Sequence, residues 1–219
     1  MIEIKDVSLT IRKTPILKNV SAVFETGKIH GLIGRNGSGK TMLMKCICGF
    51  IQPTGGEILV DGKRIGKDCD FPDSIGIIIE TPGFIPYYSG LRNLTLLADL
   101  NKKISRERVR ETMKRVGLDP DAKRHVKKYS LGMRQRLGLA QALMEDPALL
   151  ILDEPMNGLD KEGVADMRRY LLELKEQGKT VLIASHSSED IEMLCDTVSE
   201  MDKGILTPVR GTANSEIQA

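Results

Sequence analysis

The sequence predicts an α/β fold in which a block of helices is inserted into a core of alternating strands and helices. Three observations predict it. Short apolar segments alternate with helical stretches near both ends of the chain, a glycine-rich segment joins one such strand to a helix, and the pattern between Tyr88 and Glu145 is helical. Because 219 residues hold one such core but not two large domains, we expect a single domain, 1–219. Its core is formed by 1–80 and 147–219, and its helical insert by 81–146.

The first part of the core is expected to start with antiparallel strands. Apolar residues roughly alternate with polar ones from Ile2 to Ile11 and again from Ile16 to Phe24, with a turn at 25–28. A short apolar strand then enters the glycine-rich loop, and a helix follows the loop. The sequence thereafter predicts two more strands, the first ending in a tight Asp61-Gly62 turn. The expected elements after the turn are a strand at 29–33, a helix at 41–48, and strands at 57–60 and 75–79.

The second part of the chain is expected to be helical before strands return. Gly117-Leu-Asp-Pro120 is the main break in the helical block, and strands resume after Pro147. We expect residues 211–219 to form a loose tail. The expected elements of this half are strands at 149–152, 181–184 and 198–201, and helices at 161–176 and 188–195.

Charge is balanced overall but concentrated locally. The net charge of +2 gives no electrostatic case for binding nucleic acid. The stretch from Lys102 to Arg136, however, contains 13 basic and 4 acidic residues. Amphipathic helices with solvated basic faces explain this excess, and a surface that faces an anionic membrane leaflet is the alternative.

The four cysteines and the apolar runs indicate a cytosolic protein. The cysteines are scattered, and Cys46-Ile-Cys48 fits no common metal-binding spacing, so we expect reduced thiols. The chain opens on Ile2-Glu-Ile4 without the pattern of a signal peptide, and no apolar run approaches 18 residues. We therefore expect that the chain does not span a membrane.

The segment Gly34-Arg-Asn-Gly-Ser-Gly-Lys-Thr41 matches the phosphate-binding pattern G-x-x-x-x-G-K-[ST]. Glycines let successive N–H groups turn toward phosphate oxygens, and the following helix N-terminus adds positive potential. In this interpretation Lys40 neutralises the β- and γ-phosphates and Thr41 ligates Mg²⁺. An ordinary glycine-rich turn is the alternative, but the predicted strand before it and helix after it favour a P-loop NTPase (RecA-like) core. The predicted nucleotide contacts are Gly34, Asn36, Gly37, Ser38, Gly39, Lys40, Thr41 and Met42.

Two carboxylates and a histidine follow predicted strands farther along the chain. Asp153 and Glu154 end the strand at 149–152, where Asp153 can hold Mg²⁺ and Glu154 can polarise an attacking water. His186 follows the strand at 181–184 and is placed to sense the γ-phosphate. Taken alone, the carboxylates would suggest only a loop and the histidine a structural role. Together with the phosphate-binding loop they predict hydrolysis of a nucleoside triphosphate, with Lys40, Glu154 and His186 as catalytic residues.

These motifs together resemble the nucleotide-binding subunit of ATP-binding cassette (ABC) transporters, over essentially the whole chain. Tyr129-Ser-Leu-Gly-Met133 stands where that family has its Leu-Ser-Gly-Gly-Gln signature, and Asn157-Gly-Leu-Asp160 where it has its D-loop. In that family two subunits pair head to tail, and the signature of one binds the γ-phosphate of ATP held by the other. The resemblance implies that Ser130, Gly132 and Asp160 act mainly across such an interface. Ser130 is at the same time a simple helix N-cap.

Three departures from the family pattern affect the expected site. Glu80 stands where the family has a glutamine in the loop that leads to the helical subdomain, so a carboxylate there can approach Mg²⁺ but adds negative charge beside the triphosphate. Leu131 and Met133 replace a glycine and a glutamine of the signature. No aromatic residue lies near residues 11–13, where the family stacks a tyrosine on adenine, so the preference for ATP over GTP rests on the resemblance.

Three segments that include two of these departures are together similar to those of bacterial exporters of the bacitracin-resistance, lantibiotic-immunity and multidrug type: Tyr129-Ser-Leu-Gly-Met-Arg-Gln-Arg-Leu137, Ile79-Glu-Thr-Pro-Gly-Phe84 and Asn157-Gly-Leu-Asp160. The resemblance implies a subunit that dimerises on ATP with a second copy or a close paralogue. It also implies a separate permease with several membrane spans, on whose cytoplasmic side the subunit sits at the inner face of the cell membrane. No nucleic acid is expected. The alternatives are soluble cassette ATPases, either a clamp on DNA or the ribosome or a factor in iron–sulfur cluster assembly.

Overall fold

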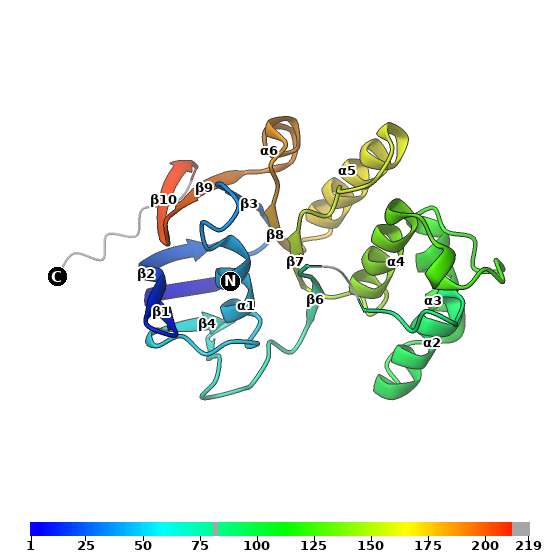
Figure 1. The fold of residues 1–219 in the computed structure, drawn as a ribbon, viewed down its shortest axis with the longest axis horizontal. Coiled ribbons are helices and arrows are strands. Elements are labelled where there is room, and N and C mark those ends of the chain that lie inside the picture. The colour runs from blue at the N-terminus through cyan, green and yellow to red at the C-terminus, as the bar shows by residue number, and fades with distance from the viewer. Residues whose placement is uncertain (81–82, 212–219) are drawn as a thin grey trace.

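The computed structural model describes residues 1–80 and 83–211, and their strands form two sheets (Figure 1). The smaller sheet is antiparallel in the order β2-β1-β4-β5, and the larger has the order β10-β9-β3-β8-β7-β6. The smaller sheet contains β1 (Ile2–Ile11), β2 (Thr14–Phe24), β4 (Gly55–Val60) and β5 (Lys63–Arg64). The larger contains β3 (Ile29–Ile33), β6 (Ile75–Ile78), β7 (Leu149–Asp153), β8 (Thr180–Ala184), β9 (Thr197–Asp202) and β10 (Ile205–Arg210).

Two hairpins in the smaller sheet confirm the expected antiparallel strands and tight turn. β1 pairs antiparallel with β2, and the connecting residues Arg12 and Lys13 have φ of 47° and 69°. β4 pairs antiparallel with β5 through Asp61 and Gly62, whose φ values are 49° and 79°. Positive φ at both central residues is what a two-residue hairpin turn of type I′ requires, and Asp-Gly supplies it at low cost.

Parallel strands form the centre of the larger sheet. β3 pairs in parallel with both β8 and β9, and β7 pairs in parallel with β8 and β6. The carboxyl ends of β3, β7 and β8 therefore open at one edge, where an open α/β sheet binds its ligand. The final strand, β10, runs antiparallel to β9 and was not predicted. Its residues are mostly exposed and include Pro208, so it shows neither the apolar run nor the composition of a buried strand.

The helices lie at the predicted positions, but the helical block contains a break that was not predicted. α1 (Lys40–Ile47), α5 (Lys161–Glu176) and α6 (Ser188–Leu194) lie where they were expected. The helical block contains α2 (Gly90–Asn101), α3 (Arg106–Arg115) and α4 (Leu131–Leu143), with a 3-10 turn at Val126–Lys128. A break at 102–105 was missed: Lys102 ends α2 with φ 53°, and the Ser105 hydroxyl accepts the first-turn N–H of α3.

The parallel sheet separates two apolar cores. In β7, Leu149 and Ile151 belong to the core shared with α1 and the antiparallel sheet. Leu150 and Leu152 point to the other face and join the core formed with the helices. Because both faces are buried, the ends of the central strands are held firmly, which is what a site at those ends requires.

The helical block lies beside the edge strand β6, and the antiparallel sheet lies at the opposite end of the molecule (Figure 1). The division of the chain into a core and an inserted subdomain at residues 81 and 146 stays a prediction. None of the helices in the described part of the chain is both long and apolar enough to cross a bilayer.

Candidate nucleotide-binding site

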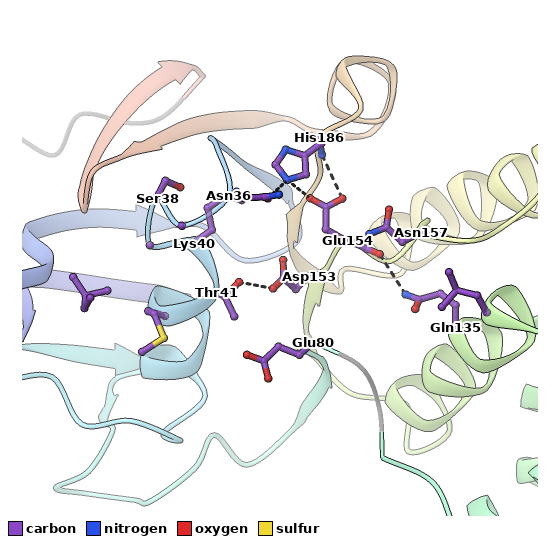
Figure 2. A pocket seen from close by; sticks show the side chains of 15 residues that line it. Asn36, Ser38, Lys40, Thr41, Glu80, Gln135, Asp153, Glu154, Asn157 and His186 are labelled. Atoms are coloured by element: carbon purple, nitrogen blue, oxygen red, sulfur yellow. Dashed lines mark hydrogen bonds and ion pairs between the residues drawn. The ribbon is translucent and has the colours of Figure 1, made fainter. Parts of the chain in front are cut away.

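A cavity of ≈ 550 Å³ opens at the carboxyl ends of β3 and β7 and collects most of the predicted site residues (Figure 2). It is bounded by the loop before α1, the end of β7, the segment after β8 and the first turns of α4. Its lining consists of Ile16, Asn36, Gly37, Ser38, Gly39, Lys40, Thr41, Met42, Glu80, Leu131, Gln135, Asp153, Glu154, Asn157 and His186.

The glycines of the phosphate-binding loop are required by its backbone path. Gly34 has φ 138°, and a Cβ there would lie 2.1 Å from the carbonyl oxygen of Met201. Gly39, with φ 118°, immediately precedes α1. Only glycine tolerates both the positive φ and the close approach. The loop thereby wraps the N-terminus of α1, where free N–H groups and the helix dipole favour an anion.

Lys40 and Ser38 present polar groups that are sheltered from solvent. Lys40 is 6% exposed, and its ammonium group donates to the carbonyl oxygens of Gly34 at 2.6 Å and Arg35 at 3.2 Å. The Ser38 hydroxyl is buried and has no hydrogen-bond partner in the structure. A buried hydroxyl costs free energy unless it is paired, so the loop fits an acceptor such as a phosphate oxygen.

Thr41 and Asp153 bring together the two groups assigned to Mg²⁺. The Thr41 hydroxyl donates to Asp153 Oδ2 at 2.7 Å, from the first turn of α1 to the end of β7. Within the described residues there is no group of three or more histidine, cysteine or acidic side chains able to enclose a metal ion. Mg²⁺ bound with nucleotides needs only one or two protein oxygens, because water and phosphate supply the rest. The hydroxyl and carboxylate therefore fit Mg²⁺ carried by a nucleotide.

Glu154 lies in a left-handed backbone conformation, with φ 50°, and faces His186. Its Oε1 lies 3.3 Å from His186 Nε2, and its Oε2 accepts the backbone N–H of His186 at 3.4 Å. His186 Nε2 also lies 2.8 Å from Asn36 Oδ1 in the phosphate-binding loop. Burial raises the pKa of the Glu154 carboxyl, and the nearby His186 opposes this shift. A half-buried carboxylate of raised basicity beside the phosphate loop suits the polarisation of a water molecule.

Glu80 enters the cavity from the segment after β6 but is paired with a lysine. Its Oε1 accepts from the ammonium group of Lys45 on α1 at 2.6 Å, and its φ is 61°. The lysine offsets the negative charge that a carboxylate adds next to a triphosphate. Glu80 thus joins α1 to the segment that leads into the helical block.

Four predicted site residues do not line this cavity. Gly34 is not among the lining residues, and it forms a turn of the loop close to the Met201 carbonyl. The Ser130 hydroxyl is exposed and accepts from Met133 N at 3.1 Å as the N-cap of α4. The Asp160 carboxylate caps α5 and accepts from Arg136 at 3.2 Å. Gly132 packs so closely on the D-loop segment that a Cβ would lie 2.4 Å from the carbonyl oxygen of Gly158.

Four residues that line the cavity were not among the predicted site residues. Gln135 donates to the carbonyl oxygens of Glu154 at 3.3 Å and Pro155 at 3.1 Å, which joins α4 to the end of β7. Leu131 and Gln135 are one helical turn apart on α4, so their common face was readable from the spacing. Asn157 and Ile16 complete the set. Of the described residues that line the cavity, none is aromatic, and Ile16 and Met42 supply apolar surface instead.

The fold and this site define a P-loop nucleotide-binding ATPase. Residues 17–157 match the family model described as ABC transporter. The chain is 45% identical over 94% of its length to the ABC transporter ATP-binding protein YybJ of Bacillus subtilis, and covers 94% of that protein. It is 38% identical to the bacitracin transport ATP-binding protein BcrA of Enterococcus faecalis, over 94% of this chain and 68% of that one. It is 36% identical to the lantibiotic transport ATP-binding protein SrtF of Streptococcus pyogenes, over 93% and 88%.

The fold is also that of a solved cassette. The dimeric ATP-binding cassette MJ0796, in a post-hydrolysis state bound to ADP and Pi, superposes with a TM-score of 0.87 at 24% identity, over 97% of this chain and 100% of that chain. The chain belongs to the ABC transporter family and is an ATP-binding subunit with ABC-type ATPase activity. Cassettes of this family dimerise and work with membrane permease subunits.

Proposed function

We propose that this subunit binds ATP with Mg²⁺, closes with a second copy or a close paralogue, and powers export of a drug or antimicrobial peptide through a separate permease. Its relatives BcrA and SrtF, named for bacitracin and lantibiotic transport, support this cargo class. The subunit then lies on the cytoplasmic side of the cell membrane, attached through the permease.

One observation carries the dimer part of the proposal. The cavity gathers the phosphate loop, Asp153, Glu154 and His186, whereas Ser130 and Asp160 lie outside it. An exposed N-cap serine at the start of a helix is suited to receive a phosphate group from outside the molecule. A second subunit facing the cavity would supply its own Ser130 and Asp160. One chain alone would therefore be a poor ATPase.

The residues of the cavity divide the work of hydrolysis. Lys40, the loop N–H groups and Ser38 bind the phosphates, and Thr41 and Asp153 hold the cation. When bound, Mg²⁺ neutralises charge that develops on the phosphate oxygens. Glu154 accepts a proton from the attacking water, and His186 orients Glu154 and the γ-phosphate. Closure driven by ATP binding supplies the mechanical step, and hydrolysis reopens the dimer.

The rival functions predict different partners. A clamp on DNA or the ribosome would need a long coiled coil or two cassettes in one chain, and the described residues contain neither. An iron–sulfur assembly factor would have soluble assembly proteins as partners. Purifying the tagged subunit from its native membrane and identifying the co-purified proteins separates these possibilities.

We expect a protein with about six hydrophobic spans to co-purify, and a strain lacking the subunit to become sensitive to a peptide antibiotic. Wild-type subunit should restore resistance and Glu154→Gln should not. Recovery of cluster-assembly or ribosomal proteins without a membrane protein would contradict the export proposal.

A further inference from the structure

The segment that carries His186 is held from behind by a charged network that joins α5 to α6. Arg168 on α5 donates to Asp190 Oδ1 on α6 from Nε at 2.8 Å and from Nη2 at 2.5 Å. The other carboxylate oxygen of Asp190 accepts from the Ser185 hydroxyl at 3.1 Å. Ser185 is the residue immediately before His186, so a single hydroxyl connects the ion pair to the segment that carries the histidine.

The residue after His186 belongs to the same network. The backbone N–H of Ser187 donates to the Ser185 hydroxyl at 3.1 Å, and the Ser187 hydroxyl accepts the N–H of Asp190 at 3.2 Å. Both neighbours of His186 are therefore fixed relative to Asp190. This leaves the histidine backbone little freedom to move toward or away from the cavity.

Burial makes the ion pair a strong constraint. Asp190 is 3% exposed and the Arg168 side chain 13% exposed. Glu189 adds a second carboxylate at 3.0 Å from the guanidinium. A buried carboxylate that lost its arginine would be an uncompensated charge, so the pair holds one geometry where an exposed pair would exchange partners with water.

Apart from its contacts with Glu154 and Asn36, the exposed His186 borders open space. A second cavity of ≈ 640 Å³ opens beside it, lined in part by Glu154, Asn157, Lys161 and Ser187. The imidazole contacts Asn36 and Glu154 on the nucleotide side, and among the described residues its other side borders this second cavity. The position of His186 therefore depends on the hydrogen bonds that hold residues 185–187. Loss of these bonds should lower the rate of hydrolysis, because small displacements of catalytic groups lower rates steeply.

We propose that Arg168 and Asp190 are positioning residues that act through Ser185 to hold His186 against Glu154 and Asn36. This inference rests on the proposed roles of Glu154 and His186 in hydrolysis. It also gives α5 two roles. The helix is capped by Asp160, which is predicted to face the second subunit, and it carries Arg168 about two turns farther on.

The test uses Asp190→Asn and Ser185→Ala in the full chain, measured for ATP hydrolysis and for ADP affinity. Asp190→Asn keeps the shape and removes the charge, and Ser185→Ala leaves the Arg168–Asp190 pair intact and removes only its link to the histidine. We expect kcat to fall about 10- to 100-fold in both, with KM and ADP affinity within about twofold. In a His186→Ala background neither change should lower kcat further.

Two controls separate positioning from general damage. Lys175→Met breaks another ion pair that α5 makes, to Asp196 after α6, without touching residues 185–187, and should leave kcat unchanged. The chain has three histidines, so NMR can follow the His186 ring; its resonance should shift in both variants while that of His30 stays.

Three results would count against these ideas in different ways. If both variants hydrolyse ATP at the wild-type rate while His186→Ala does not, the positioning proposal is wrong. If either lowers kcat further in the His186→Ala background, Arg168 and Asp190 do not act through the histidine. If His186→Ala itself hydrolyses ATP normally, the proposed role of the histidine fails first.

Discussion

The Thr41 hydroxyl donates a 2.7 Å hydrogen bond to Asp153 across 112 positions of sequence. It links the first turn of the helix after the phosphate loop to the end of a central strand. Both groups were assigned to Mg²⁺ from sequence, and their contact places them at one point of the cavity.

Replacing Thr41 by valine should weaken nucleotide binding about tenfold when Mg²⁺ is present and about twofold or less in EDTA, because only the cation contact is lost. Titration with a fluorescent nucleotide in both buffers measures this. Thr54→Val, which removes an exposed hydroxyl bonded to Ser8 at 3.0 Å, is the matched control. Equal losses with and without Mg²⁺ would show that Thr41 serves the fold and not the cation.

Replacing Glu154 by glutamine should lower ATP hydrolysis at least 100-fold and trap an ATP-bound dimer, because water is no longer polarised while nucleotide binding is kept. Gel filtration with ATP and Mg²⁺ detects the dimer. Glu162→Gln changes an exposed carboxylate in the first turn of α5 and should behave as wild type. A variant that stays monomeric would refute either the role of Glu154 or the dimer.

Ser130 and Ser105 offer a matched pair, since the hydroxyl of each accepts the third N–H of a helix at 3.1 and 3.2 Å. Changing either to alanine should cost about 1 kcal/mol of stability through loss of the cap. Only Ser130→Ala should also abolish ATP-dependent dimerisation in the Glu154→Gln background. Thermal unfolding and gel filtration give the two readouts, and equal dimer formation by both variants would argue that Ser130 is a cap alone.

Glu80→Gln should leave ATP affinity within about tenfold, or roughly 1.4 kcal/mol, if Glu80 serves coupling to the helical block. The ion pair with Lys45 is lost, but a glutamine still reaches the cavity. Asp73→Asn, which breaks an exposed pair with Lys63 at 2.6 Å, controls for removing a surface ion pair. A much larger loss in nucleotide titration would make Glu80 a principal ligand of Mg²⁺.

The raised pKa of Glu154 predicts a pH-dependent cost to stability. In the folded protein the Glu154 carboxyl keeps its proton at pH values above its ordinary pKa of 4.5. The contribution of Glu154 to the free energy of unfolding therefore falls as pH rises from 4.5 through the folded-state pKa. At pH 7 Glu154→Gln should therefore be more stable, by roughly 1 kcal/mol and about 2–4 °C in Tm. The gain should shrink as pH is lowered toward 4.5. If the gain in stability were independent of pH, it would come from packing and not from the ionisation of Glu154.

Sequence patterns predicted the elements that carry dense local signals. The phosphate loop, the apolar strand before Asp153 and the Asp61-Gly62 turn each combine composition with spacing, and the structure places all three as expected. β10 escaped because an exposed edge strand containing Pro208 has no apolar periodicity. The break at Lys102 escaped because a left-handed lysine carries no compositional mark.

At the site, a different kind of feature could not be predicted from the sequence. Residues in the motifs could be assigned from sequence, but the partners that hold them could not. The contact of His186 with Asn36 joins residues 150 positions apart, and Gln135 reaches backbone carbonyls that any residue would provide. Contacts of this kind depend on tertiary packing, which leaves no local pattern.

The sheet edge at β10 has a consequence for how copies of this chain meet. Pro208 lacks an amide hydrogen, and charged Arg210 ends the strand. Proteins use proline and charge in this way to prevent the edge strands of two sheets from pairing side by side. Two subunits brought together at high concentration therefore gain little by extending β10 into a shared ribbon, which disfavours fibrous self-association of this chain.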